Sequence, residues 1–132
     1  MMTKFTTSLL TAAVFAIGAM TATAPVQADE VIASGTFEGR SDHRTDGEVS
    51  IIKTDSGYQV VLSDDFSLDG APDPTLAFGK DGFASEAEFT ALKSNDGHQV
   101  YDLPEGLDPT AYDEFYVWCS EYAVPLGFAD LK

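Results

Sequence analysis

The sequence predicts an all-β protein, folded as a single antiparallel β-sandwich or small barrel of about seven to nine short strands. Short apolar stretches alternate with polar residues at the two-residue period of a strand, as in Tyr58–Ser63. Asp-Gly and Pro signals, which are typical of turns, separate these stretches at short intervals. No apolar stripe of helical period is long enough to predict a helix.

The first half of the fold contains one clear hairpin. Ala33–Phe37 is predicted to be a strand, and the polar connection GRSDHRTDG follows it. Glu48–Lys53 and Tyr58–Ser63 then form a hairpin, because both alternate and Gly57 can take the positive φ that a short loop requires. After the turn-rich stretch SLDGAPDP, Thr75–Gly79 is the next expected strand.

The second half is expected to add a second hairpin and a closing strand. Residues 80–88 leave two options open, since their Ser-Glu-Ala-Glu run could begin a helical turn but is too short to hold a helix without tertiary support. Phe89–Lys93 and His98–Leu103 are predicted to pair as a hairpin across a turn that ends in Asp-Gly. A last strand lies near Tyr122–Phe128, where Pro125 predicts an edge or a bulge.

Glu114–Cys119 is expected to be the central strand, because it is apolar on both faces. Cys119 shares one face with Phe115, whereas Trp118 lies on the other. Such a strand normally has both faces covered, which places Cys119 in or near the core. Eight residues on the strand alternations are predicted to face the core: Val49, Ile51, Val60, Leu62, Leu76, Val100, Val117 and Cys119.

The N-terminal segment, residues 1–28, is predicted to be a secretory signal peptide. It has an early positive charge at Lys4, an apolar run from Leu9 to Met20, and small residues before Asp29. The run is shorter than the roughly 18 residues needed to cross a bilayer, which disfavours the competing interpretation of an uncleaved membrane anchor. Residues 29–132 are then one exported domain, periplasmic or extracellular, with no membrane span in the mature chain.

The formal net charge of −15 restricts the partners of this domain. Nucleic acids and anionic membranes are polyanions that need Lys or Arg facing them, so neither is an expected partner. We expect a monomer whose acidic surface serves solubility.

Cys119 is the only cysteine in the sequence, so an exported chain cannot form an internal disulfide with it. Three uses remain open from the residues alone. The thiol can be an inert buried group, a redox-active or ligand thiolate, or half of an intermolecular disulfide.

The order of several short motifs resembles the electron-transfer DM-thirteen domain, which also occurs beside DOMON domains. The resemblance covers essentially all of residues 29–132. These motifs are Gly35-Thr36-Phe37, His43 with Gly47 and Val49, Phe66, Pro72-Asp73, Gln99-Val100-Tyr101 with Pro104, Val117-Trp118-Cys119, and Gly127-Phe128-Ala129-Asp130-Leu131.

The resemblance implies a redox or electron-transfer module that acts through Cys119. The family's hallmark cysteine follows an aromatic residue in the penultimate strand, which matches Trp118-Cys119. It implies either a redox thiol or a ligand for a prosthetic group such as haem, with His43 as the second candidate ligand. A redox partner protein is the expected partner. Covalent haem attachment is excluded, because no Cys-x-x-Cys-His run is present, and the alternative for His43 is a solvated loop histidine.

Two other hypotheses remain from the residues. The chain could be a non-catalytic binding or adhesion domain, with Cys119 in the core and the loops SLDGAPDP and EGLDPTAYD as its working surface. No metal site is predicted. Calcium is a weaker alternative on the carboxylates of Asp64, Asp65, Asp69 and Asp73, because the EF-hand pattern is absent and Asp in turns usually caps its own backbone.

Overall fold

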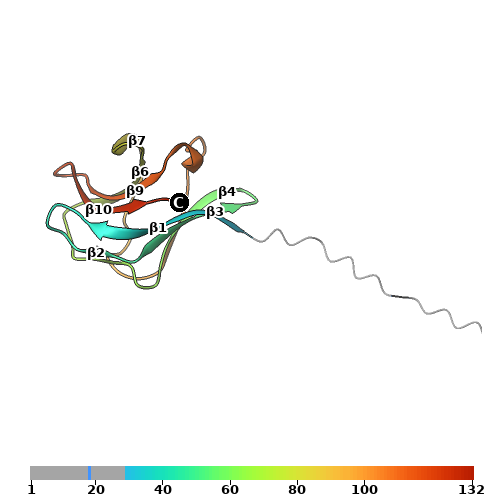
Figure 1. Ribbon diagram of the computed structural model, residues 1–132, viewed down its shortest axis with the longest axis horizontal. Helices are drawn as coiled ribbons and strands as arrows, with labels where there is room; N and C mark the ends of the chain where they lie inside the picture. Colours follow the sequence, from blue (N-terminus) through green and yellow to red (C-terminus); the bar gives the residue numbers. More distant parts are fainter. Residues whose placement is uncertain (1–17, 19–28) are drawn as a thin grey trace, which may run out of the picture.

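The computed structural model describes Gly18 and residues 29–132, so the predicted signal peptide lies, apart from Gly18, outside the described residues. The described chain consists of short strands and one 3-10 turn (Figure 1), which confirms the all-β prediction. The elements are β1 (Glu30–Gly39), β2 (Thr45–Asp46), β3 (Glu48–Thr54), β4 (Gly57–Leu62), β5 (Ser67–Leu68), β6 (Pro74–Gly79), β7 (Phe83–Ala91), β8 (Gln99–Asp102), η1 (Pro109–Ala111), β9 (Glu114–Cys119) and β10 (Val124–Asp130).

Eight strands form one curled antiparallel sheet, in the order β7-β6-β9-β10-β1-β3-β4-β8, and β2 pairs with β5 separately. The first and last strands lie side by side, with Phe37 of β1 opposite Ala129 of β10 (Figure 1). This closing pair places β9 inside the sheet, between β6 and β10. The inner face of the curled sheet therefore encloses the core, as in a half-barrel.

Aromatic side chains fill much of this core. The ring of Phe115 on β9 makes an edge-on contact with Phe78 at a centroid distance of 5.1 Å, and Phe37 lies 5.5 Å from Phe66. Seven of the eight predicted core residues are confirmed as buried, each at 1% exposure or less: Val49, Ile51, Val60, Leu62, Leu76, Val117 and Cys119.

The prediction for Val100 is wrong, because β8 turns the face that carries Gln99 and Tyr101 inward. Val100 is 39% exposed, whereas its neighbours Gln99 and Tyr101 are 8% and 3% exposed. Both buried side chains have hydrogen-bond partners: the Tyr101 hydroxyl donates to Gln99 Oε1, and Gln99 Nε2 donates to the carbonyl of Ser94 at 2.9 Å. A satisfied polar pair can replace an apolar residue inside a core, and an alternation rule does not detect this exchange.

We expect Tyr101→Phe to lower the free energy of unfolding by about 1–2 kcal/mol, because the hydroxyl is used twice. It donates to Gln99 and accepts from the backbone N–H of Lys93 at 3.0 Å. Val100→Thr, on the exposed face of the same strand, should change stability by less than about 0.5 kcal/mol. Urea unfolding of the three proteins measures the difference. Equal effects of the two substitutions would contradict the assigned facing of β8.

The predicted second hairpin is also wrong. β7 pairs with β6 and β8 pairs with β4, so these two strands lie at opposite edges of the sheet. The Asp-Gly turn between them spans the gap instead: Gly97 N–H donates to the carbonyl of Phe66, and Asn95 accepts from Leu68 N–H at 2.7 Å. Residues 80–88 are not a helical turn either, since most of them belong to β7, whose Ala87 is fully buried.

Two turn predictions are confirmed. The β3–β4 hairpin places Thr54 opposite Gly57, and Gly57 has a φ of +150°. In β10 the register shifts between Pro125 and Gly127, as expected of a bulge at a residue without an N–H donor. β10 itself is an interior strand, because β9 and β1 lie on its two sides.

Candidate functional site

Cys119 is the last residue of β9 and its side chain points into the core. It lies opposite Pro74 of β6 and Val124 of β10, and only 1% of its surface is exposed. The alternation of β9 explains this position, because Phe115 and Val117 point to the same side and are fully buried. The sulfur is therefore held by the ends of three neighbouring strands.

A single loop separates this thiol from solvent. Cys119 Sγ donates a hydrogen bond to the backbone carbonyl of Pro72 at 3.1 Å, and Ser120 N–H donates to the carbonyl of Asp73 at 3.1 Å. Pro72 and Asp73 are themselves exposed. We call residues 69–73 the covering loop. The thiol is thus buried under one layer of backbone rather than deep in the protein.

The other end of the covering loop is fixed by Asp69. Its Oδ1 lies 2.9 Å from Nδ1 of His43, and its Oδ2 accepts from the backbone N–H of Arg44 at 3.0 Å. The Asp69 N–H donates to the carbonyl of Arg44 at 3.1 Å. The hydrogen bond from Arg44 N–H, followed by that from His43, lowers the pKa of Asp69 below its usual 3.8. The carboxylate is therefore ionised at neutral pH.

The two predicted site residues contact different parts of this same loop and not each other. Cys119 contacts Pro72, and His43 contacts Asp69. The side chain of His43 is 29% exposed and pairs with a carboxylate. The sequence argument did not identify Asp69 and Pro72 as partners of the site. Their sequence signals were the turn-rich stretch SLDGAPDP, which contains both, and the Pro72-Asp73 motif of the family resemblance.

The residues do not fit a haem held by Cys119. An iron ligand needs open space beside its sulfur for the porphyrin, but Cys119 Sγ faces the carbonyl of Pro72. Cys119 lines none of four surface cavities of the described domain, and the one beside His43, of about 480 Å³, is lined by the covering loop only at Asp69. The closed loop therefore leaves no space for a haem beside this sulfur.

The weaker calcium hypothesis is not supported by the arrangement of carboxylates. Within residues 29–132, no three His, Cys, Asp or Glu side chains gather as a metal site would require. Asp69 is occupied by His43 and Arg44, and Asp65 Oδ1 accepts a hydrogen bond from the hydroxyl of Ser63. These carboxylates fix local backbone and side chains, as Asp in turns commonly does.

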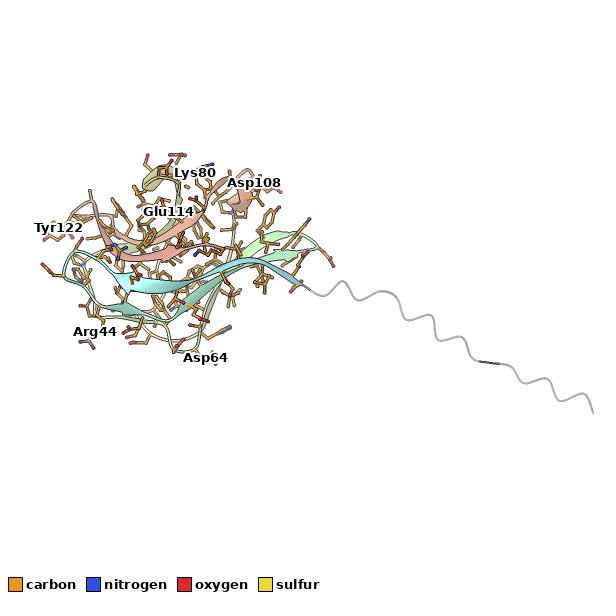
Figure 2. The ribbon with its side chains drawn as sticks, in the orientation of Figure 1. Arg44, Asp64, Lys80, Asp108, Glu114 and Tyr122 are labelled. Carbon is orange, nitrogen blue, oxygen red and sulfur yellow. The ribbon has the colours of Figure 1, made fainter. Side chains whose placement is uncertain are left out.

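The second loop of the binding-domain hypothesis, EGLDPTAYD, lies at the opposite end of β9. Pro74 of β6 pairs with Cys119, whereas Gly79 at its other end pairs with Glu114. Figure 2 shows this separation, because Tyr122, which lies just after Cys119 in the chain, is far from Asp108 of the second loop. The two loops therefore do not form one continuous surface.

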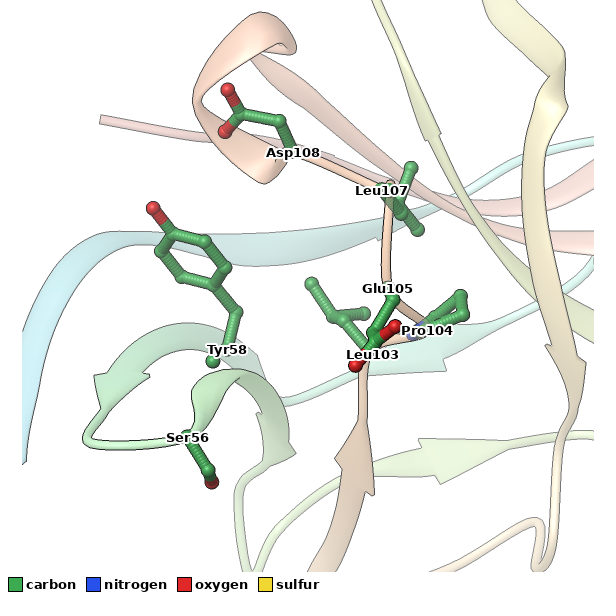
Figure 3. Close-up of a pocket in the computed structure, with 9 residues that line it drawn as sticks. Ser56, Tyr58, Leu103, Pro104, Glu105, Leu107 and Asp108 are labelled. Carbon is green, nitrogen blue, oxygen red and sulfur yellow. The ribbon is translucent and has the colours of Figure 1, made fainter.

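This second loop lines two open cavities. One, of about 310 Å³, lies between the β3–β4 turn and the loop, with Tyr58, Leu103 and Leu107 around it (Figure 3). The other, of about 620 Å³, extends toward Glu86 and Tyr112. In neither cavity does a lining residue belong to the covering loop.

The comparison with protein families agrees with the resemblance seen in the motifs. A family model described as "Electron transfer DM13" matches residues 36–131, which include His43, the covering loop and Cys119. No curated protein and no solved structure gives a significant match. No helix in the described part of the chain is long and apolar enough to cross a membrane. From its match over most of its length, the chain belongs to the DM13 electron-transfer family.

Proposed function

We propose that this electron-transfer module is exported and that the thiol of Cys119 is its redox group. The observation that carries the proposal is the position of the thiol, buried under one exposed loop and bonded to its Pro72 carbonyl. An inert core cysteine needs no such partner. A reactive thiol in an oxidising compartment gains protection from a cover that can open. The sequence of residues 1–28 supports export.

The reaction that we propose is thiol–disulfide exchange with partner molecules. In the first step Cys119 Sγ attacks one sulfur of an oxidised partner's disulfide. The partner's S–S bond breaks, a mixed disulfide forms, and the other partner sulfur leaves and takes up the proton lost from Cys119. In the second step two thiols of an electron donor attack in turn. They release the first partner as a dithiol and regenerate the Cys119 thiol, while the donor becomes a disulfide.

Opening of the covering loop must precede the exchange. With 1% exposure, the sulfur is not accessible to a second sulfur atom in the closed arrangement. Local opening costs less than global unfolding where few apolar contacts hold a segment, and Asp69, Pro72 and Asp73 are all exposed. The rate of exchange should therefore follow the fraction of molecules with the loop open.

The test uses protein produced with residues 1–132 and recovered from the cell envelope. We expect an intact mass that begins at Asp29, one equivalent of thiol released from an aromatic disulfide under native conditions, and no Soret absorption. A mass that retains residues 1–28 would contradict export. A thiol that reacts only after denaturation would contradict the redox role, and a Soret band would show that a haem is present in place of the bare thiol.

A further inference from the structure

The outer face of the sheet, opposite the core, carries a continuous cluster of aromatic side chains. Phe83 of β7 stacks on Trp118 of β9 with ring centroids 3.7 Å apart and planes 2° from parallel. Tyr116 lies 6.2 Å from both rings and 5.4 Å from Phe128 of β10. We call Phe83, Tyr116, Trp118 and Phe128 the aromatic patch. The prediction that both faces of β9 are covered is confirmed for Phe115, Tyr116 and Val117, which are buried, whereas Trp118 on the outer face is half-buried.

An acidic groove borders the aromatic patch. A cavity of about 350 Å³ lies on the same outer face beside Phe128, across β10, β1 and β3. Three carboxylates line it, those of Glu38, Glu48 and Asp130, and we refer to this cavity as the acidic groove. Lys132 is the cation that lines it, and its Nζ lies 3.9 Å from Asp130 Oδ2. The groove is therefore negative at neutral pH.

Arg40 shows how this face accommodates a cation. Its guanidinium carbon lies 4.9 Å from the centroid of Phe128, and its Nη2 lies 3.1 Å from Glu38 Oε2. One Arg side chain of the protein thus uses an aromatic ring and a carboxylate of the outer face together. Lys or Arg side chains of another molecule would find further carboxylates in the acidic groove, those of Glu48 and Asp130.

We propose that the aromatic patch and the acidic groove form the docking surface for a redox partner protein with a basic face that has an apolar centre. The apolar centre would cover the half-buried rings of Phe83, Trp118 and Phe128, and Lys or Arg side chains would enter the groove. Charge complementarity of this kind accelerates encounter and sets orientation, and it suits the small, transient interfaces of electron-transfer complexes. The net charge of −15 adds long-range attraction for a basic partner.

The inference rests on the proposed function, because it names the partner of the Cys119 site. Trp118 directly precedes Cys119, so the aromatic patch reaches the thiol's end of β9, whereas the acidic groove lies beside the other end, where Asp130 is opposite Glu114. Trp118 lies opposite Thr75 of β6, and Pro74, the residue before Thr75, directly follows the covering loop in the chain. A partner that binds the aromatic patch is therefore held beside the covering loop. Docking and exchange use different side chains, so they can be separated by mutation.

The test exploits Trp118, which is the only tryptophan in the sequence and lies in the aromatic patch. Its fluorescence is followed while the protein is titrated at low salt with a peptide of alternating Lys and Leu. Oligolysine of equal charge is the control probe. We expect the Lys-Leu peptide to bind more tightly and to shift the Trp118 emission to shorter wavelength, and we expect added salt to weaken binding.

Two charge-matched double variants locate the interaction. Glu38→Gln with Glu48→Gln should weaken binding of the Lys-Leu peptide about tenfold. Glu105→Gln with Asp108→Asn removes the same charge from the two cavities lined by the second loop and should change binding less than about twofold. Equal binding of both probes, or equal loss in both double variants, would overturn the docking surface. Cys119→Ser should bind the peptide as the native protein does. If it does so while disulfide exchange proves independent of Cys119, the proposed redox function fails and the docking surface stands.

Discussion

Replacing Cys119 with serine should reduce the protein's acceleration of disulfide reduction to the uncatalysed rate. The assay follows reduction of insulin disulfides by dithiothreitol, in which the module would relay electrons from the thiol reagent to the disulfide. A hydroxyl cannot form the mixed disulfide, so no partial activity is expected. Serine is the appropriate variant, because its hydroxyl can still donate to the Pro72 carbonyl that now accepts from Cys119 Sγ.

The structure also sharpens the expected stability of this variant. A buried hydroxyl without a partner costs about 1–3 kcal/mol, but the Pro72 carbonyl is available at this position. We therefore expect Cys119→Ser to lie at or below the lower end of that range, with a melting temperature only a few degrees below that of the native protein. A variant that melts much earlier yet keeps full activity per folded molecule would show that Cys119 serves packing alone.

The parts of the fold that the sequence predicted are those set by local alternation and by turns. β3, β4 and β9 follow the two-residue period, and Gly57 identifies the hairpin of β3 and β4. The prediction failed where the local pattern did not decide which face of a strand lies inward. In β8 one apolar residue, Val100, stood between Gln99 and Tyr101, and a polar pair that satisfies itself took the inner face. No local pattern can reveal that exchange.

The candidate site was likewise predicted only in part. Cys119 and its inward direction follow from the alternation of β9, because the residue shares a face with Val117. The covering loop could not be derived, because the contact between Cys119 and Pro72 joins residues 47 positions apart and the contact between His43 and Asp69 joins residues 26 apart. Turn residues predict that a chain reverses, but they do not indicate which strand end the reversed segment will cover.

Asp69→Asn should open the covering loop and increase the rate of Cys119 labelling at neutral pH about tenfold. The carboxylate accepts from Arg44 N–H with one oxygen and pairs with His43 Nδ1 through the other. An amide carries no charge, so the charge-assisted bonds to Arg44 N–H and His43 are weakened. His43→Ala leaves the bond to Arg44 in place and should give a smaller increase. Asp64→Asn, a substitution at an exposed loop residue with the same change of charge, should label at the native rate.

The pH dependence gives this prediction a second and independent readout. Because the pKa of Asp69 in the folded protein is below the usual 3.8, its contacts stabilise the closed loop above that pH and are lost as the pH falls through the folded value. The difference in labelling between native protein and Asp69→Asn should therefore be present at neutral pH and vanish in acid below the folded pKa of Asp69. A dipyridyl disulfide, which reacts with thiols in acid, measures both proteins over this range. If the native protein and Asp69→Asn label equally at neutral pH, Asp69 does not hold the loop, and the cover over Cys119 is fixed by Pro72 and Asp73 alone.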